Sequence, residues 1–315
     1  MAGYCYLDGK VTPLDETMVN IRTHALHYGT GCFEGIRGYW NEEHEELYVL
    51  HLREHFQRME RSGRILKIKL PFDPDGLAEI TLDLLRRNGD RNDVYIRPLA
   101  FKGDHSLGPR VHDCPDSFAV YAFPLGKYIE NDKPIRCGVS TWRRVDDNGI
   151  PARAKVTGLY INSALARTEA NENGYDEAIV LTHDGHVSEG SAENIFIVQD
   201  GQLITPPPSD NILVGITRKS VMLLAREELG IPTIERQIDR TELYISDEVF
   251  LCGTGAEITP VGEIDRRPIG NGQMGPITRQ LQQIYFAAVR GQVDRYRHWL
   301  SPVFASAKVA TPPAT

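Results

Sequence analysis

The sequence predicts a two-domain protein of the mixed α/β class. Three observations support this. The 315 residues suffice for two domains of roughly 100 to 200 residues each. Strand-like and helix-like segments alternate along the chain. Between Pro124 and Pro134 the chain is rich in Gly, Pro and charge and has no periodicity. We therefore expect a small N-terminal α/β domain (1–123), an interdomain loop (124–135), a larger C-terminal domain (136–300) and a disordered tail (301–315).

The N-terminal part predicts a hairpin followed by two amphipathic helices. Asp8-Gly9 lies between alternating segments and is a strong signal for a two-residue hairpin turn. Farther on, apolar residues recur at helical spacing in two stretches. The expected inner faces are Leu52, Phe56 and Met59 in the first helix and Leu77, Ile80 and Leu84 in the second.

The C-terminal part predicts short strands with helices packed on them. Asp184-Gly185 and Asp200-Gly201 indicate two more hairpins, which favour a mainly antiparallel sheet. The predicted helices cover 158–174, 215–230 and 275–291.

Composition points to a cytoplasmic protein with a small-molecule partner. The 35 Lys and Arg against 43 Asp and Glu give a formal net charge of −8, which is no footprint for nucleic acid or an anionic membrane. No apolar stretch approaches the roughly 18 residues of a membrane span, and the first ten residues lack signal-peptide features. The cysteines form no C-x-x-C pair, which predicts free, buried thiols rather than disulfides or a zinc site. They are Cys5, Cys32, Cys114, Cys137 and Cys252.

Lys155 and Glu189 are the first candidate functional residues. Lys155 follows an extended segment and precedes a predicted helix, and no acidic residue is beside it. A lysine is usually solvent-exposed, but a buried one tends to lose its proton and becomes a nucleophile. Glu189, in VSEGSAENIF, is either a solvated turn residue or a carboxylate for a buried cationic ring nitrogen. A pyridoxal cofactor needs such a carboxylate.

Two turns add anion-binding potential. Gly215, Ile216 and Thr217 precede a helical pattern, so their N–H groups are expected at a helix N-terminus that suits a phosphate. A plain N-cap threonine is the alternative for this stretch. Gly253-Thr254-Gly255 follows a strand and permits close backbone approach. An amine, a carboxylate and two such turns are what a phosphate-bearing aldehyde cofactor requires.

From the first hairpin to the last helix, the chain resembles the branched-chain amino acid aminotransferases, which are pyridoxal 5′-phosphate (PLP) enzymes of fold type IV. The resemblance implies a small α/β domain, a larger domain with a pseudo-barrel of mainly antiparallel strands, and a homodimer or higher homo-oligomer. The motifs that carry it are HALHYGTGCFEGIRGY, LREHFQRM, YIRPLAF, AKVTGLYINSALA, GYDEAIVL, VSEGSAENIF, TPP, GITR, DEVFLCGTGAEITPV and GPIT.

The resemblance also implies cofactor contacts. Lys155 would form the internal aldimine and shuttle the substrate proton, Glu189 would pair with the pyridine nitrogen, and Tyr160 would bond the phenolic oxygen. Arg53 would contribute fixed charge to the phosphate cradle. The implied cofactor residues are Arg53, Lys155, Tyr160, Glu189, Asn194, Leu213, Gly215, Ile216, Thr217, Gly253 and Thr254.

The implied substrate pocket is apolar with a charged rim. Arg97 would pair with the γ-carboxylate of glutamate or 2-oxoglutarate, and Thr254 and Gly255 would receive the α-carboxylate. Gly255 departs from the usual Ala of the family, which leaves substrate breadth open. The implied substrate residues are Tyr28, Phe33, Gly35, Arg37, Tyr95, Arg97, Tyr128, Tyr160, Thr254, Gly255 and Ala256.

The function that follows is reversible transamination between Leu, Ile or Val and 2-oxoglutarate in two half-reactions. The alternatives are a related transaminase acting on D-amino acids or R-amines, and a non-catalytic PLP-binding protein. No metal is expected, because His24 and His27 have no third ligand pattern nearby.

Overall fold

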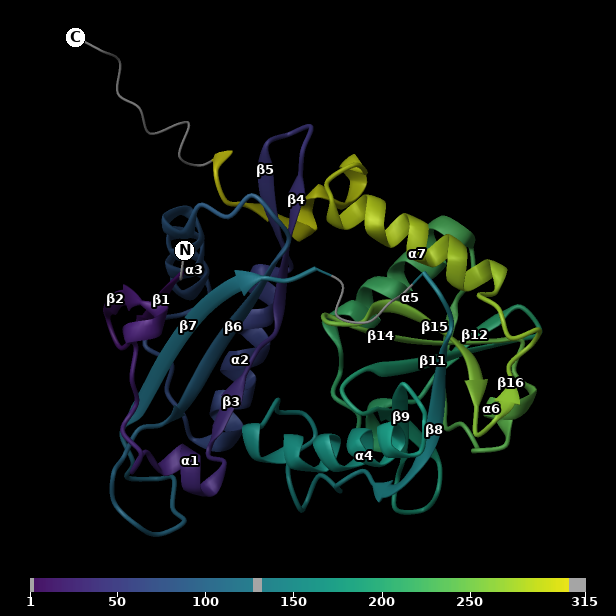
Figure 1. Ribbon diagram of the computed structural model, residues 1–315, viewed down its shortest axis with the longest axis horizontal. Helices are drawn as coiled ribbons and strands as arrows, with labels where there is room; N and C mark the ends of the chain where they lie inside the picture. Colours follow the sequence, from purple (N-terminus) through teal and green to yellow (C-terminus); the bar gives the residue numbers. More distant parts are fainter. Residues whose placement is uncertain (1–2, 127–131, 306–315) are drawn as a thin grey trace. The chain divides into compact units, whose positions relative to one another are not determined.

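The computed structural model describes residues 3–126 and 132–305, which form two compact units (Figure 1). Of the described residues, the first unit contains 3–126, the short segment Ala154–Gly158, and 287–305. The second contains 132–153 and Leu159–Phe286. After leaving the first unit, the chain therefore returns to it twice. The sequence-based prediction has two continuous domains and includes neither return.

The first unit is built on an eight-stranded sheet in the order β17-β5-β4-β6-β7-β1-β2, with β3 paired to β6. All of these pairs are antiparallel. The strands are β1 (Tyr4–Leu7), β2 (Lys10–Pro13), β3 (Gly31–Phe33), β4 (Ile36–Asn41), β5 (Glu46–Leu50), β6 (Val94–Lys102), β7 (Asp116–Pro124) and β17 (Leu300–Pro302). The helices are η1 (Leu14–Glu16), α1 (His24–Tyr28), α2 (Leu52–Leu66), α3 (Pro74–Asn88) and η4 (Asp294–Trp299).

The predicted hairpin and the two predicted helices are confirmed. Leu7 pairs with Lys10 across Asp8 and Gly9, which both have positive φ as a type I′ turn requires. Helices α2 and α3 pack their apolar faces into one core with the sheet, except that Ile80 is partly buried at its edge. The Asp73 side chain caps α3 by accepting from the Gly76 N–H at 2.8 Å.

The chain end expected to be disordered is ordered over residues 301–305, while residues 306–315 lie outside the described residues. β17 pairs with β5, and Val303 is fully buried. The buried Glu46 carboxylate accepts from the backbone N–H groups of Val303, Phe304 and Ala305 at 2.9, 2.7 and 2.6 Å. A carboxylate that satisfies several backbone donors holds a segment that has no periodic pattern of its own.

The second unit is built on a nine-stranded sheet in the order β10-β9-β8-β15-β14-β11-β12-β13, with β16 paired to β15. Most pairs are antiparallel, but β8 runs parallel to both of its neighbours and β13 runs parallel to β12. The strands are β8 (Ile135–Arg143), β9 (Glu177–Leu181), β10 (Val187–Gly190), β11 (Asn194–Gln199), β12 (Gln202–Thr205), β13 (Thr233–Glu235), β14 (Glu248–Gly253), β15 (Glu257–Ile264) and β16 (Arg267–Pro268). The helices are η2 (Thr157–Leu159, which begins in the first unit), α4 (Tyr160–Glu172), η3 (Pro208–Asp210), α5 (Ile216–Leu229), α6 (Glu242–Ile245) and α7 (Pro276–Val289, whose last residues belong to the first unit).

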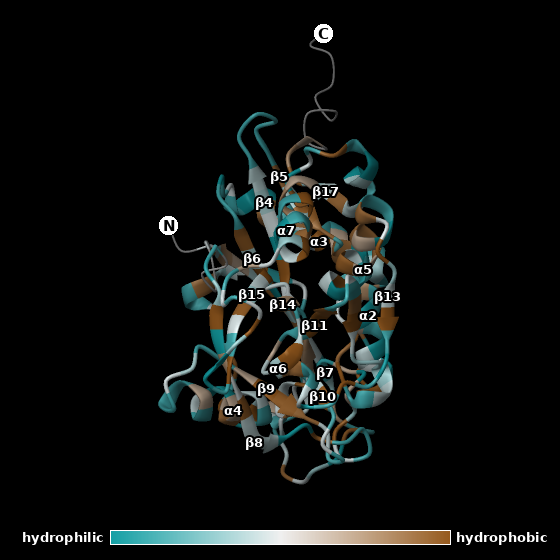
Figure 2. Ribbon diagram, turned by 90° about the vertical axis from the view of Figure 1, so that its right-hand side faces the viewer, coloured by the Kyte–Doolittle hydropathy of each residue, from teal (hydrophilic) through white to brown (hydrophobic). Residues whose placement is uncertain are grey.

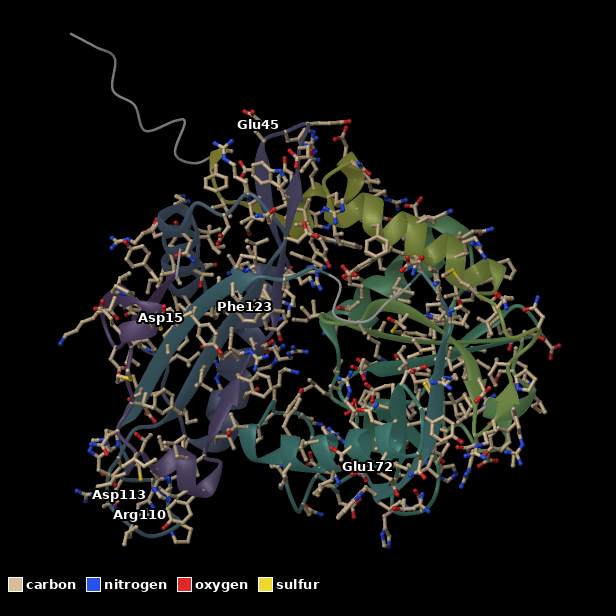
Figure 3. The ribbon with its side chains drawn as sticks, in the orientation of Figure 1. Asp15, Glu45, Arg110, Asp113, Phe123 and Glu172 are labelled. Carbon is tan, nitrogen blue, oxygen red and sulfur yellow. The ribbon has the colours of Figure 1, made fainter. Side chains whose placement is uncertain are left out.

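The tip of the β4–β5 hairpin is hydrophilic (Figure 2). Glu45 lies at that tip (Figure 3). All five cysteines are free and buried, as predicted. In the described part of the chain, no helix has the length and apolar character to cross a bilayer.

Candidate active site

The backbone of Lys155 is fixed on both sides within the first unit. Its N–H donates to Ser62 Oγ of α2 at 3.3 Å, and its carbonyl accepts from the Phe33 N–H at 3.1 Å. The next residue, Val156, bridges to Cys32. The Lys155 ammonium lies 5.0 Å from the centroid of the Phe33 ring. The lysine side chain therefore starts from a rigid backbone and points at an aromatic face.

A buried ion cluster lies next to this lysine segment. The fully buried Glu34 carboxylate accepts from Arg58 Nε and Nη2 at 2.7 and 2.6 Å and from His55 Nδ1 at 2.8 Å. Burial alone would raise the pKa of Glu34, but the Arg58 guanidinium and His55 hold it well below its usual range. Burial lowers the pKa of His55, against the opposing pull of Glu34. Glu34 is thus ionised and clamps Arg58 through two parallel bonds.

Arg53 does not occupy the position expected of a phosphate ligand. Its side chain is 60% exposed and is paired with Asp75 of α3 at 2.5 Å. The inner side of α2 carries Arg58 instead, and the Arg58 carbonyl accepts from Ser62, which also contacts Lys155. The sequence motif contains both arginines, and only the helical packing distinguishes the buried one from the surface one.

Four of the predicted substrate residues, Phe33, Arg37, Tyr95 and Arg97, lie together in the first unit. Arg97 donates to the Tyr95 hydroxyl at 2.9 Å, and its guanidinium lies 4.6 Å from the Phe33 ring centroid. A Cβ at Gly35 would lie 2.1 Å from the Tyr95 hydroxyl, so a larger residue there would displace the Tyr95 side chain. Arg37 is buried and donates to the Gly126 carbonyl at 2.7 Å.

Three of the predicted tyrosines are not part of that group, and one of them, Tyr160, lies on α4 in the second unit. Tyr28, on α1, is 37% exposed, and its hydroxyl accepts from the Gly108 N–H at 3.1 Å. Tyr128 lies outside the described residues.

In the second unit, Glu189 is a buried carboxylate surrounded by donors. The side chain of Arg144 lies 2.9 Å from its Oε1. Its Oε2 accepts from Asn194 Nδ2 at 3.2 Å and from the Leu213 N–H at 3.1 Å. The solvated-turn alternative for Glu189 is therefore wrong, because only 6% of its side chain is exposed.

Asn194 connects Glu189 to the predicted phosphate turn. Its side chain also donates to the Leu213 carbonyl at 2.9 Å, and its Oδ1 occupies the space that a Cβ of Gly215 would need. Gly215 is the N-cap of α5 and no side chain caps this end, so the interpretation of Thr217 as a plain N-cap is wrong. The N–H groups of Ile216 and Thr217 thus open at a helix N-terminus.

The remaining predicted residues lie at element ends. Gly253 ends β14, and Thr254 to Ala256 form the turn into β15. The Ala256 carbonyl accepts from Thr259 Oγ1 at 2.7 Å, and Glu257 has a positive φ of 57°, so the turn is tightly constrained. Tyr160 is the first residue of α4.

Sequence reasoning missed Arg58 and Arg144. Arg58 follows His55 at i+3, a spacing that places both on one helix face, but surface arginines have the same spacing on many helices. Arg144 follows a strand and gave no signal at all. Across residues 3–126 and 132–305, no group of three potential metal ligands is present.

Comparisons with known proteins identify the family. The sequence profile of the family "Amino-transferase class IV" matches residues 31–264. The "Probable branched-chain-amino-acid aminotransferase" of Aquifex aeolicus is 52% identical over 96% of this chain and 97% of its own length. The chain therefore belongs to the class IV aminotransferases, within their branched-chain-amino-acid branch.

Solved structures agree. The branched-chain amino acid aminotransferase of Thermobaculum terrenum in its PLP form is 42% identical, with a TM-score of 0.91 over 96% of this chain and 98% of that chain. The branched-chain aminotransferase of the thermophilic archaeon Thermoproteus uzoniensis with norvaline is 44% identical, with a TM-score of 0.91 over 96% and 99%. The expected fold type is thus confirmed.

Beside Glu189, the second unit contains a pair of buried carboxyl groups. Glu193 accepts from the Ala192 N–H at 3.0 Å, and Glu177 lies 3.5 Å from Arg167 Nε. Burial and the neighbouring Glu177 charge raise the pKa of Glu193 to about 8. Folded Glu193 therefore keeps its proton to a higher pH than an ordinary glutamate does.

This proton predicts a pH-dependent stability. Between pH about 4.5 and about 8, unfolded Glu193 is ionised and folded Glu193 is not, so folding takes up a proton and stability falls as pH rises. Glu193→Gln removes this dependence. Urea unfolding should be measured at a series of pH values. As the pH rises, the free energy of unfolding of the variant should increase relative to that of the wild type by up to ~1.4 kcal/mol per pH unit. Glu172→Gln, at the exposed Glu172 of α4 (Figure 3), is the control. Parallel curves for wild type and Glu193→Gln would contradict the assignment.

Proposed function

We propose that this chain catalyses reversible, PLP-dependent transamination between branched-chain L-amino acids and 2-oxoglutarate. The observation that carries the proposal is the Glu189 cluster: a buried carboxylate held by Arg144 and Asn194, joined through Asn194 to the open N-terminus of α5. Storage of a vitamin needs no such carboxylate. The named relatives support the substrate class.

The residues fit the cofactor by the chemistry of their donors. In the second unit, Glu189 would face the ring nitrogen, and the α5 N-terminus with Thr217 would bind phosphate. In the first unit, Arg58 rather than Arg53 would supply fixed charge for the phosphate, because Arg58 is buried and aligned by Glu34. When bound, PLP supplies an electron sink that stabilises negative charge at the substrate Cα.

The protein residues do the rest of the work. Lys155 would anchor the cofactor through its amine and carry the proton removed from the substrate Cα. Tyr160 would hydrogen-bond the phenolic oxygen. The turn at Thr254, Gly255 and Ala256 would receive the α-carboxylate. The Phe33 ring and Gly35 favour an aliphatic side chain, and the Tyr95–Arg97 pair gives the pocket a charged group for glutamate.

We also infer a cytoplasmic homodimer or higher homo-oligomer. Five free thiols fit a reducing compartment. Apolar side chains near α1 are unusually exposed, with Met18 at 77%, Ile21 at 80% and Leu107 at 81%, which is typical of a surface covered by another subunit.

Lys155→Ala tests the function directly. The variant should lose steady turnover with L-leucine and 2-oxoglutarate but still bind PLP noncovalently, because Arg58 and the α5 N-terminus are unchanged. In the wild type, borohydride reduction and peptide mapping should find the pyridoxyl group on Lys155. A label on another lysine would refute the assignment.

Arg53 and Arg58 of α2 form a matched pair. Arg58→Lys keeps the charge but loses the planar fork, so PLP affinity should fall on the order of 10-fold or more. Arg53→Lys alters an exposed ion pair and should leave the affinity within about twofold. Titration with pyridoxal, which lacks the phosphate, isolates the effect: its affinity should change little in either variant. A larger loss of PLP affinity in Arg53→Lys than in Arg58→Lys would show that Arg53, and not Arg58, binds the phosphate.

Arg97→Ala should separate the two half-reactions. Without Arg97, the γ-carboxylate of glutamate is unpaired in an apolar pocket, at a cost on the order of 2 to 5 kcal/mol. Single-turnover kinetics should therefore show a loss of roughly 30-fold or more with glutamate and a few-fold with L-leucine. Equal losses with both substrates would mean that Arg97 is a scaffold residue.

A further inference from the structure

Arg144 is a buried cation in direct contact with Glu189. It follows β8, and its backbone N–H donates to the Leu181 carbonyl of β9 at 2.8 Å. Its Nε donates to the Asn211 carbonyl at 2.9 Å, and its Nη2 lies 2.9 Å from Glu189 Oε1. The two side chains are 4% and 6% exposed. One backbone bond and one guanidinium bond thus hold Arg144 in contact with the Glu189 carboxylate.

Two further contacts of Glu189 are with neutral donors. Asn194 and the Leu213 N–H both donate to Oε2, so they favour an accepting carboxylate but contribute no charge. Burial and the neighbouring Glu177 charge raise the pKa of a nearby acidic residue, Glu193, which favours its neutral form. Arg144 therefore brings a full positive charge into direct contact with Glu189.

We propose that Arg144 is a positioning residue that decides where the proton between Glu189 and a bound pyridine ring resides. This inference rests on the proposed function, in which Glu189 faces the ring nitrogen. The proton can reside on either of two groups, the Glu189 carboxylate or the ring nitrogen. A cation bonded to the carboxylate stabilises its ionised form, so the proton stays on the nitrogen and the ring remains a strong electron sink.

The size of the effect follows from the charge. An opposite charge within about 4 to 6 Å lowers a carboxyl pKa by roughly 1 to 3 units, which corresponds to a roughly 10- to 1,000-fold shift of the proton toward the nitrogen. Once Arg144 is removed, the neutral donors remain, but burial then favours the protonated form of Glu189. The ring nitrogen would lose its proton to Glu189.

The test is ¹⁵N NMR of the enzyme loaded with ring-¹⁵N-labelled PLP, which distinguishes a pyridinium from a neutral pyridine without any turnover. Arg144→Met removes charge and hydrogen bonds, Arg144→Gln removes the charge but keeps a polar side chain, and Arg144→Lys keeps the charge. Arg218→Met is the matched control, because Arg218 is equally buried in the same unit but pairs with Glu235 at 2.6 Å.

We expect a pyridinium signal in the wild type, Arg144→Lys and Arg218→Met, and a shift toward neutral pyridine in Arg144→Met and Arg144→Gln. The single-turnover rates with L-leucine and with glutamate should fall together, on the order of 10- to 100-fold, in the two neutral variants. If Arg144→Met does not fold, Arg144→Gln carries the comparison.

A pyridinium signal that persists in the neutral variants would overturn the inference and make Arg144 a scaffold residue that supports Asn211. The inference is equally overturned if Arg218→Met shows the same shift as Arg144→Met. Failure of the proposed function has a different signature, because the wild type would then neither bind PLP through Lys155 nor react with L-leucine.

Discussion

The position of the Lys155 backbone depends on how the short segment Ala154–Gly158 is held. Its chain neighbours on both sides belong to the second unit, yet the segment itself packs with the first. Two backbone hydrogen bonds, from Lys155 to Ser62 and from Phe33 to Lys155, hold it against α2 and β3. Because the backbone is held, the Lys155 side chain extends from a fixed Cα, and its ammonium lies 5.0 Å from the centroid of the Phe33 ring.

Each unit uses a buried carboxylate–guanidinium pair beside its candidate functional residues. In the first unit Glu34 forms an ion pair with Arg58, and in the second Arg144 forms an ion pair with Glu189. Burying four charges costs free energy that hydrophobic residues of similar volume would not. Each pair instead holds one charged group in a fixed position. In the first unit that group is the Arg58 cation, which suits an anion, and in the second it is the Glu189 anion, which suits a cationic ring.

Under the proposed function, cofactor chemistry and substrate choice rest on different parts of the molecule. The cofactor chemistry would depend on hydrogen bonds to backbone and buried side chains, such as Asn194 with Leu213. The substrate preference would depend on the group around Phe33, Tyr95 and Arg97, where a single added Cβ at Gly35 would collide with a hydroxyl group. Related enzymes can therefore share the first set while their pockets differ.

The sequence alone determined the local elements and singled out Lys155, Glu189 and the α5 start, because turn signals, helical periodicity and glycine-flanked motifs are local. Tertiary structure decided which arginine of α2 is buried, because Arg53 and Arg58 occupy one motif but opposite environments. It likewise revealed Arg144, and it ordered residues 300–305 through contacts with β5 and Glu46. Those outcomes depend on contacts between residues far apart in the chain, and burial and pairing of charge are set by such contacts rather than by neighbours in sequence.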